Sequence, residues 1–203
     1  EDEACRVLKL TPSHIQLADE KWFQEATAKT LVVGGEPLQP AHVDTCLAQT
    51  EHRLINEYGP TEAAVGCVTH RINRHETPLI GQPIAGVGVA VIDEHTKLVP
   101  RGVAGELCLM GKSLASGYLN DTGQTERAFT RLNEIPEEIA YRTGDLVRMQ
   151  NDGKLLFLSR IDDQIKLNGY RIEVQEIRQV IERAFGIACH VCAIKFSGGK
   201  QLV

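Results

Sequence analysis

The sequence has no apolar stretch near the roughly 18 residues that a membrane-spanning helix needs, and no signal-peptide pattern at its start. It also lacks an excess of positive charge, because 22 Lys and Arg stand against 27 Asp and Glu and give a formal net charge of −5. A broad positive field of the kind that attracts nucleic acid is therefore excluded. We expect neither a membrane nor a nucleic acid as a partner.

Cysteine is sparse, with six residues scattered through 203. Disulfide scaffolds are shorter and denser in cysteine, so we expect reduced thiols and a cytoplasmic protein. Cys189 and Cys192 have the spacing of half a zinc site, but no second pair exists to complete a zinc ribbon. We interpret these two residues as small apolar side chains of a buried strand.

The composition itself is that of a globular protein, with 42% hydrophobic and 24% charged residues. The first part of the chain predicts a strand at residues 30–33, a helix from Pro40 to about residue 51 and a strand at 53–56. A strand, a helix and a second strand in this order, with Gly34-Gly35 as the turn, indicate a βαβ unit.

The rest of the chain changes character. Short apolar runs separated by turn residues predict an antiparallel β region, with a hairpin turn at 151–153. A second hairpin turn is predicted at 168–169, and apolar spacing predicts a helix over 174–185 that ends at Gly186. Because both ends of the chain fall in predicted strands, 5–10 and 200–203, we expect a piece of a longer protein.

These patterns predict a multi-subdomain fold of mixed α/β and α+β class. Residues 1–85 form part of an α/β sheet layer, residues 86–161 a distorted antiparallel β region, and residues 162–203 a small α+β part. The family resemblance described below implies that this last part is a hinge and the start of a small C-terminal lobe.

Three segments carry the chemistry. Asn56-Glu57-Tyr58-Gly59-Pro60-Thr61-Glu62 follows a predicted strand, and ligands bind at the carboxyl ends of strands in open α/β sheets. The second segment is Tyr141-Arg142-Thr143-Gly144-Asp145-Leu146, in which Gly144 lets the backbone approach a ligand. The third is the charged run from Ser159 to Lys166. Taken singly, each segment also fits an ordinary polar loop, a capped turn or a solvated linker.

Together, in this order and with Gly105-Glu106-Leu107 and Gly117-Tyr118-Leu119 between them, the segments resemble the adenylation domains of nonribosomal peptide synthetases. The resemblance covers essentially the whole chain. Such domains have a large lobe and a small C-terminal lobe, and the chain corresponds to the last part of the large lobe and the start of the small one. It implies a ligase that joins an amino acid to ATP as an aminoacyl-adenylate, releases pyrophosphate, and passes the aminoacyl group to a phosphopantetheine thiol. The implied partners are a peptidyl carrier protein and a condensation domain, and the implied cofactors are ATP and Mg²⁺.

The resemblance also implies roles for single residues around the nucleotide. Tyr58 would stack on adenine and Asn56 would bind the adenine edge. The backbone of three further residues would line the other side of the base: Gly35, Glu36 and Pro37.

For the phosphate, the metal and the ribose, the resemblance implies that Thr61 binds the α-phosphate, Glu62 helps to hold Mg²⁺, and Asp145 takes the ribose hydroxyls. The residues implied at the nucleotide border are Phe157 and Arg160, and the residue implied as the hinge of the small lobe is Asp162.

The implied amino-acid pocket is lined by Lys9, Val32, Gly34, Glu57, Val65 and Gly66. A lysine donor and a glutamate acceptor together match a side-chain carboxamide, so we predict asparagine as the substrate, with aspartate next. The alternative is that Lys9 and Glu57 pair with each other over a different small substrate.

Two parts of the family pattern have no match: the loop that handles the outer phosphates and the catalytic lysine near the C-terminus of such domains. We therefore expect the chain by itself to be inactive. Two alternatives stay open: a ligase that joins a carboxylic acid to CoA, and a truncated non-catalytic domain that binds a nucleotide or a protein.

Overall fold

The computed structural model describes residues 5–18, 22–23, 28–48, 52–162, 164–167, 170–196 and 199–203. The chain divides into two compact units, residues 1–159 and 160–203. The first unit contains two sheets, and the second contains two hairpins and a helix. The mixed α/β and α+β class expected from the sequence is confirmed, while the subdomain boundaries at 85/86 and 161/162 stay a prediction.

The first sheet has the strand order β1-β2-β3-β4-β5. Strands β1, β2 and β3 run parallel, and β4 and β5 are antiparallel to their neighbours. Its elements are β1 (Val7–Leu10), α1 (Pro12–Leu17), β2 (Thr30–Gly34), α3 (Pro40–Leu47), β3 (Arg53–Tyr58), the 3-10 helix η1 (Thr61–Ala63), β4 (Val68–Ile72) and β5 (Gln82–Pro83). The predicted βαβ unit is confirmed as β2-α3-β3.

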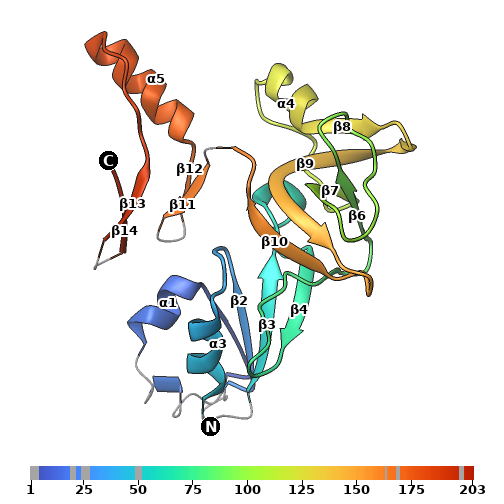
Figure 1. Cartoon of the computed structure of the whole chain (residues 1–203), viewed down its shortest axis with the longest axis vertical. Helices are drawn as coiled ribbons and strands as arrows, with labels where there is room; N and C mark the ends of the chain where they lie inside the picture. Colours follow the sequence, from blue (N-terminus) through green and yellow to red (C-terminus); the bar gives the residue numbers. More distant parts are fainter. Residues whose placement is uncertain are drawn as a thin grey trace. The chain divides into compact units, whose positions relative to one another are not determined.

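Helices α1 and α3 cover one face of this sheet (Figure 1). Helix α3 begins at Pro40, whose missing N–H costs nothing at a first helical position. The His42 ring accepts a hydrogen bond from the Gln39 N–H, which satisfies one further donor at this end. Leu31 and Leu54 of the sheet pack under the helices without solvent exposure, so this side is the core of the sheet.

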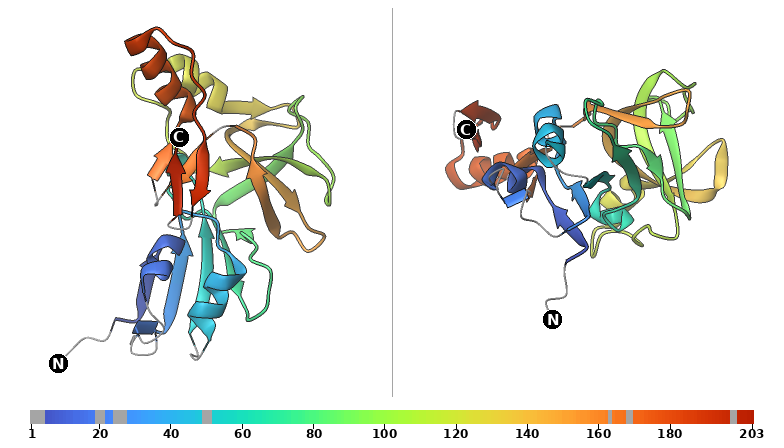
Figure 2. Two further views of the ribbon diagram at one scale, coloured as in Figure 1. Left: turned by 60° about the vertical axis from the view of Figure 1, so that its left-hand side comes forward. Right: turned by 90° about the horizontal axis from the view of Figure 1, so that it is seen from below.

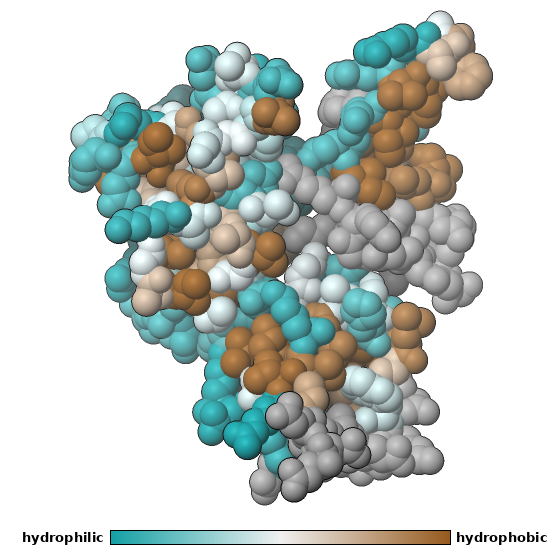
Figure 3. Space-filling view, turned by 180° about the vertical axis from the view of Figure 1, so that it is seen from behind, coloured by the Kyte–Doolittle hydropathy of each residue, from teal (hydrophilic) through white to brown (hydrophobic). Residues whose placement is uncertain are grey.

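The opposite face of the sheet carries the alternate residues of the same strands. Lys9, Val32 and Ile55 lie side by side across β1, β2 and β3. Seen from behind, apolar side chains gather over this part of the molecule (Figure 3), and Val7 on the same face of β1 is 58% exposed. The sheet therefore has one face packed by helices and one open apolar face with polar residues toward its upper edge.

The second sheet has the strand order β10-β9-β7-β6, with β8 paired to β9. Its elements are β6 (Val87–Ile92), β7 (Ala104–Gly111), α4 (Thr122–Ala128), β8 (Phe129–Leu132), β9 (Ile135–Met149) and β10 (Leu155–Arg160). The pairs of β6, β7, β8 and β9 are antiparallel, as predicted. The predicted turn at 151–153 joins β9 to β10, where the Gln150 N–H donates to the Lys154 carbonyl at 2.7 Å.

One buried cluster joins the two sheets of the first unit. Ala63 and Val68, next to the ends of β3 and β4, pack in the same cluster as Leu107, Leu109 and Tyr141 of the second sheet. Two views of the ribbon show the first sheet meeting the second at this end (Figure 2). This shared core determines how the end of β3 lies against β9.

The second unit contains β11 (Ile165–Leu167), β12 (Tyr170–Ile172), α5 (Val174–Phe185), β13 (Ala193–Phe196) and β14 (Gly199–Leu202). The predicted helix is confirmed, and Gly186 ends it with a left-handed φ of 66°. The predicted turn at 168–169 lies outside the described residues. Among the described residues, no helix combines the length and the apolar character needed to cross a membrane.

Two expectations differ from the structure. Cys189 and Cys192 precede β13 instead of lying in a buried strand, and both are half-buried. Short pairs of apolar residues do not distinguish a strand from the segment before it. Short helices within the antiparallel region were expected without bounds, and α4 is one of them. Several elements were not predicted from sequence: α1, β4, β5 and β8.

Candidate functional site

The candidate site of the first unit starts at the carboxyl ends of its parallel strands. Because β1, β2 and β3 are parallel, the segments that follow them emerge at the same edge of the sheet. The segments at this edge are Gly35–Pro37 after β2 and Gly59–Glu62 after β3. Gly35 has a φ of 87°, a conformation that suits glycine and lets the chain turn away from the strand.

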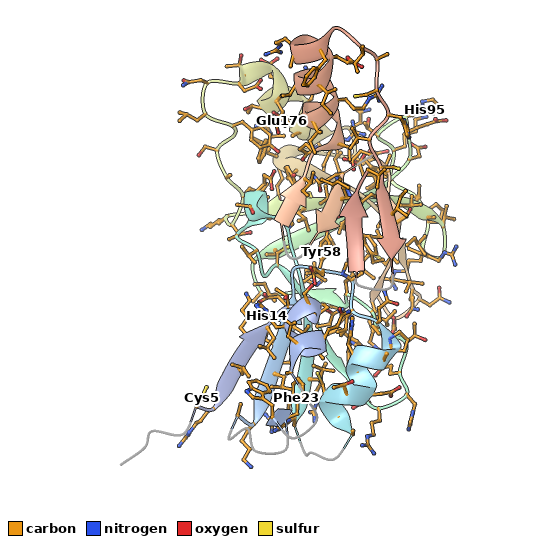
Figure 4. The ribbon with its side chains drawn as sticks, turned by 90° about the vertical axis from the view of Figure 1, so that its left-hand side faces the viewer. Cys5, His14, Phe23, Tyr58, His95 and Glu176 are labelled. Atoms are coloured by element: carbon orange, nitrogen blue, oxygen red, sulfur yellow. The ribbon has the colours of Figure 1, made fainter. Side chains whose placement is uncertain are left out.

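Tyr58 and Asp145 form the central contact of the site, although 87 residues separate them along the chain. Tyr58 ends β3 in the first sheet, and Asp145 belongs to β9 in the second sheet. The Tyr58 hydroxyl donates a hydrogen bond to Asp145 Oδ2. Figure 4 shows Tyr58 at the upper end of the first sheet, where the strands of the second sheet begin. The structure thus brings together the residue expected at adenine and the residue expected at ribose.

Electrostatics keep Tyr58 protonated. Burial raises the pKa of the Tyr58 hydroxyl well above its usual value, and the negative charge of Asp145 raises it further. The hydroxyl is therefore a hydrogen-bond donor throughout the physiological pH range.

Asp145 is presented by a bulge in β9. Glu106 pairs with Leu146 and Cys108 pairs with Arg142, so the single residue Leu107 of β7 faces residues 143–145 of β9. The Thr143 hydroxyl donates to the Leu107 carbonyl at 2.8 Å and accepts the Asp145 N–H at 3.0 Å. The extra residues interrupt the regular pairing of β9 with β7, and the carboxylate of Asp145 points toward the end of β3.

A buried carboxylate supports the same bulge. Glu106 accepts from Arg142 Nε at 2.9 Å and Nη2 at 2.5 Å, and from the Gly144 N–H at 3.0 Å. The pKa of Arg142 is raised by its hydrogen bond to Glu106, so its guanidinium stays charged. Sequence reasoning gave no role to Glu106 or Thr143, although each stands in a segment that it singled out.

Glu62 lies in η1, directly after the turn at Gly59-Pro60. Its carboxylate is buried and accepts the Tyr118 hydroxyl at 2.7 Å, while its carbonyl accepts the Ala115 N–H at 2.8 Å. The segment 115–118, between β7 and α4, therefore holds Glu62 by both its backbone and its side chain. Thr61 next to it is exposed, as a residue that meets a phosphate must be.

The residues around Glu62 are compatible with Mg²⁺ brought by a nucleotide, the role that the resemblance implies for Glu62. Mg²⁺ in nucleotide sites is held by one or two carboxylates together with substrate phosphates and water. Glu62 supplies one carboxylate, and no group of three or more His, Cys, Asp or Glu that could hold an ion occurs among the described residues.

Most of the residues expected to line an amino-acid pocket lie on or beside the open face of the first sheet. Lys9 Nζ lies 2.5 Å from Glu57 Oε2, with the lysine side chain 57% exposed and the glutamate side chain 16% exposed. Two glycines leave room for Glu57: a Cβ on Gly34 would lie 2.6 Å from its carbonyl oxygen, and a Cβ on Gly66 would lie 2.4 Å from its Oε1. Val32 lies next to Lys9 on this face, and Val65 is exposed with a φ of 68°.

Other predicted residues make different contacts. Asn56 is buried and donates from Nδ2 to the Leu79 carbonyl at 2.7 Å. Glu36 accepts from the Ser13 N–H at 2.9 Å, which ties the segment after β2 to the start of α1. Their expected roles at adenine stay predictions, as does that of Pro37.

The last three predicted residues lie around the boundary between the two units. Phe157 is partly buried against the core cluster of the second sheet. In the second unit, Arg160 Nε donates to Asp162 Oδ1 at 2.8 Å, and the Gln164 N–H donates to the same oxygen at 3.1 Å. Asp162 therefore lies close to the unit boundary at 159/160, and its role as a hinge stays a prediction.

Comparison with known proteins identifies the family. The family model described as AMP-binding enzyme matches residues 1–119, and the chain belongs to this family. Among curated relatives, bacitracin synthase 3 of Bacillus licheniformis is 38% identical over 90% of this chain and 3% of its own length. Tyrocidine synthase 2 of Brevibacillus parabrevis is 41% identical over 75% of this chain and 4% of its own length.

Solved structures agree in fold. PA1221, described as an NRPS protein containing adenylation and PCP domains, superposes with a TM-score of 0.82 at 32% identity, over 97% of this chain and 42% of that one. The Vibrio cholerae adenylation domain AlmE, solved with glycyl-adenosine-5′-phosphate, has a TM-score of 0.81 at 30% identity, over 97% of this chain and 40% of that one. The chain thus spans less than half of either structure, and the resemblance seen in its motifs is confirmed.

Proposed function

We propose that the chain is part of an adenylation domain of a nonribosomal peptide synthetase, which converts an amino acid and ATP to an aminoacyl-adenylate and pyrophosphate. The observation that carries the proposal is the contact between Tyr58 and Asp145. It places an aromatic ring and a carboxylate from two separate sheets at one edge, where an adenosine needs a stacking surface and a partner for its hydroxyls. The relatives that match the chain are synthases of this kind.

In this proposal the residues position groups and stabilise charge, and none of them forms a covalent bond to the substrate. Tyr58 stacks on adenine and Asp145 binds the ribose hydroxyls. Thr61 donates to the α-phosphate, and Glu62, held by Tyr118, would hold Mg²⁺, which would supply positive charge to neutralise the phosphates. The aminoacyl group is then transferred to the phosphopantetheine thiol of a carrier protein, next to a condensation domain. None of the six cysteines, all of them among the described residues, forms a disulfide, which fits the cytoplasmic location that we propose.

Asparagine is the substrate that we propose for the complete domain. The Lys9 ammonium has three donors and uses one on Glu57 Oε2, so it keeps donors for a substrate carbonyl. Glu57 Oε1 lies against Gly66, which has no side chain, and in this proposal it accepts from the substrate amide N–H₂. A carboxamide uses both groups, whereas the carboxylate of aspartate is repelled by Glu57. The short Lys9–Glu57 contact also fits the alternative of a small substrate above a closed ion pair.

Pyrophosphate exchange by the complete adenylation domain, measured with a panel of amino acids, tests the proposal. We expect the strongest signal with asparagine and the next with aspartate. Glycine or alanine as the best substrate would favour the closed ion pair, and an apolar amino acid with asparagine at background would refute the pocket assignment. Exchange only with a carboxylic acid that lacks an amino group, followed by transfer to CoA, would favour the acyl-CoA class. ATP binding without any exchange would indicate a non-catalytic domain.

A further inference from the structure

At the bulge that contains Asp145, the regular pairing of β9 with β7, which normally holds a strand in place, is interrupted. Between the pairs Glu106–Leu146 and Cys108–Arg142, three residues of β9 face one residue of β7. Bulges of this kind recur near functional sites, where they redirect a side chain. The position of the Asp145 carboxylate therefore depends on contacts other than the regular strand pairing.

Glu106 supplies such contacts from within the sheet. Glu106 is 8% exposed, and its two side-chain oxygens accept three hydrogen bonds, from Arg142 just before the bulge and from Gly144 within it. Oε2 binds the guanidinium of Arg142 just before the bulge, and Oε1 binds the Gly144 N–H within it. Because both bonds are made by the same carboxylate, Glu106 holds Arg142 and Gly144 at a set separation.

Gly144 links Glu106 to the site, because its N–H binds Glu106 and the next residue in the chain is Asp145. It has a φ of 68°, so its N–H turns inward to Glu106 while the chain continues to Asp145. The Asp145 N–H is held by Thr143, and the Asp145 carboxylate by Tyr58. Without the Glu106 carboxylate, the Gly144 N–H and the Arg142 guanidinium lose their acceptor, and the backbone just before Asp145 is less firmly held.

We propose that Glu106 is a positioning residue for nucleotide binding: it holds the β9 bulge so that the Asp145 carboxylate meets the ribose hydroxyls. The proposal rests on the proposed function, because it takes Asp145 as the ribose ligand. Glu106 itself contacts neither substrate nor reacting atoms, and it acts only through residues 142–145.

The test compares ATP with 2′,3′-dideoxy-ATP, which lacks both hydroxyls, in pyrophosphate exchange by the complete domain. Asp145→Ala is expected to reduce the preference for ATP, as a ratio of kcat/KM values, by about 10- to 100-fold, the range of one hydrogen bond to a charged group. Glu106→Gln is expected to reduce the same ratio by at least about 3-fold, because small misplacements of binding groups are costly. The double variant should equal Asp145→Ala alone, since both changes act on one contact.

A purely structural role of Glu106 would lower the activity with both nucleotides equally and leave their ratio unchanged, which overturns the proposal. Glu76→Gln is the matched control: it breaks a carboxylate contact to His70 of 2.8 Å in the same unit and should leave the ratio unaltered. If Glu106→Gln does not fold, Glu106→Asp keeps the charge but shortens the side chain, and an unchanged ratio in that folded variant again overturns the proposal. An unchanged ratio in Asp145→Ala would instead refute the role proposed for Asp145, and the inference with it.

Discussion

The contact between Tyr58 and Asp145 allows a quantitative prediction about stability. Replacing Tyr58 by Phe keeps the ring and removes only the hydroxyl, so Asp145, 7% exposed, loses a donor. A hydrogen bond to a charged group contributes about 1.5–3 kcal/mol, and a buried acceptor that loses its donor costs a similar amount. We therefore expect the free energy of unfolding of Tyr58→Phe to be about 2 kcal/mol lower at neutral pH.

The same contact predicts a pH dependence with a definite sign. The folded pKa of Tyr58 is raised above its unfolded value, so the folded state favours the protonated hydroxyl. Its contribution is complete below the unfolded pKa of about 10 and is lost as the pH rises toward the folded pKa. Wild-type protein should therefore lose stability above about pH 10, and Tyr58→Phe should lose less.

Urea unfolding at about pH 7.5 and about pH 10.5 measures both effects. The difference between wild type and Tyr58→Phe should shrink at the higher pH, because the other tyrosines and lysines titrate equally in both proteins. Equal midpoints at neutral pH, or a difference that grows with pH, would show that Tyr58 and Asp145 do not form this contact in solution.

Three other predictions concern packing and the pocket. Gly34→Ala should lower the folded yield or the urea midpoint of unfolding, because the added Cβ meets the Glu57 backbone. Gly66→Ala should keep the midpoint, because its Cβ meets only the end of the Glu57 side chain. It should instead change the ranking of amino acids by activity in the pyrophosphate exchange assay. Leu109→Ala should cost about 2–5 kcal/mol in urea unfolding, since Leu109 is fully buried between the sheets. Burial raises the pKa of the Cys46 thiol to about 12, so iodoacetamide should modify it only after unfolding; rapid labelling of the native protein at Cys46 would contradict its buried position.

The motifs made much of the site predictable. Residues 56–58 end strand β3 of the first sheet and residues 59–62 follow it, at the edge where strand order and the Gly-Pro turn predict them. Lys9 and Glu57, assigned to one pocket by resemblance, are in direct contact. Local patterns succeed for the turn and the strands because turn residues and strand spacing act over a few residues, whereas Lys9 and Glu57 lie on β1 and β3 and were assigned by the resemblance.

Other parts depended on contacts that no local pattern contains. The short strand β5 is only two residues long and pairs with β4 in the folded sheet, so its residues have no period of their own. In the sequence, Glu106 is a single charged residue within an apolar strand. Its role depends on contacts with Arg142 and Gly144, which lie 36 and 38 residues later along the chain. The contact of Tyr118 could not be predicted either, because its hydrogen-bond partner Glu62 lies 56 residues away along the chain.

The sequence by itself therefore determined the family, the βαβ unit, the antiparallel region and the last helix, and it named the residues expected around the nucleotide, because motif spacing and alternation are properties of the chain. Only the tertiary structure showed that Tyr58 and Asp145 share one hydrogen bond, that a bulge in β9 presents Asp145, and that Glu106 holds this bulge. The physical reason is that a buried carboxylate needs donors, and folding alone decides which distant donors reach it.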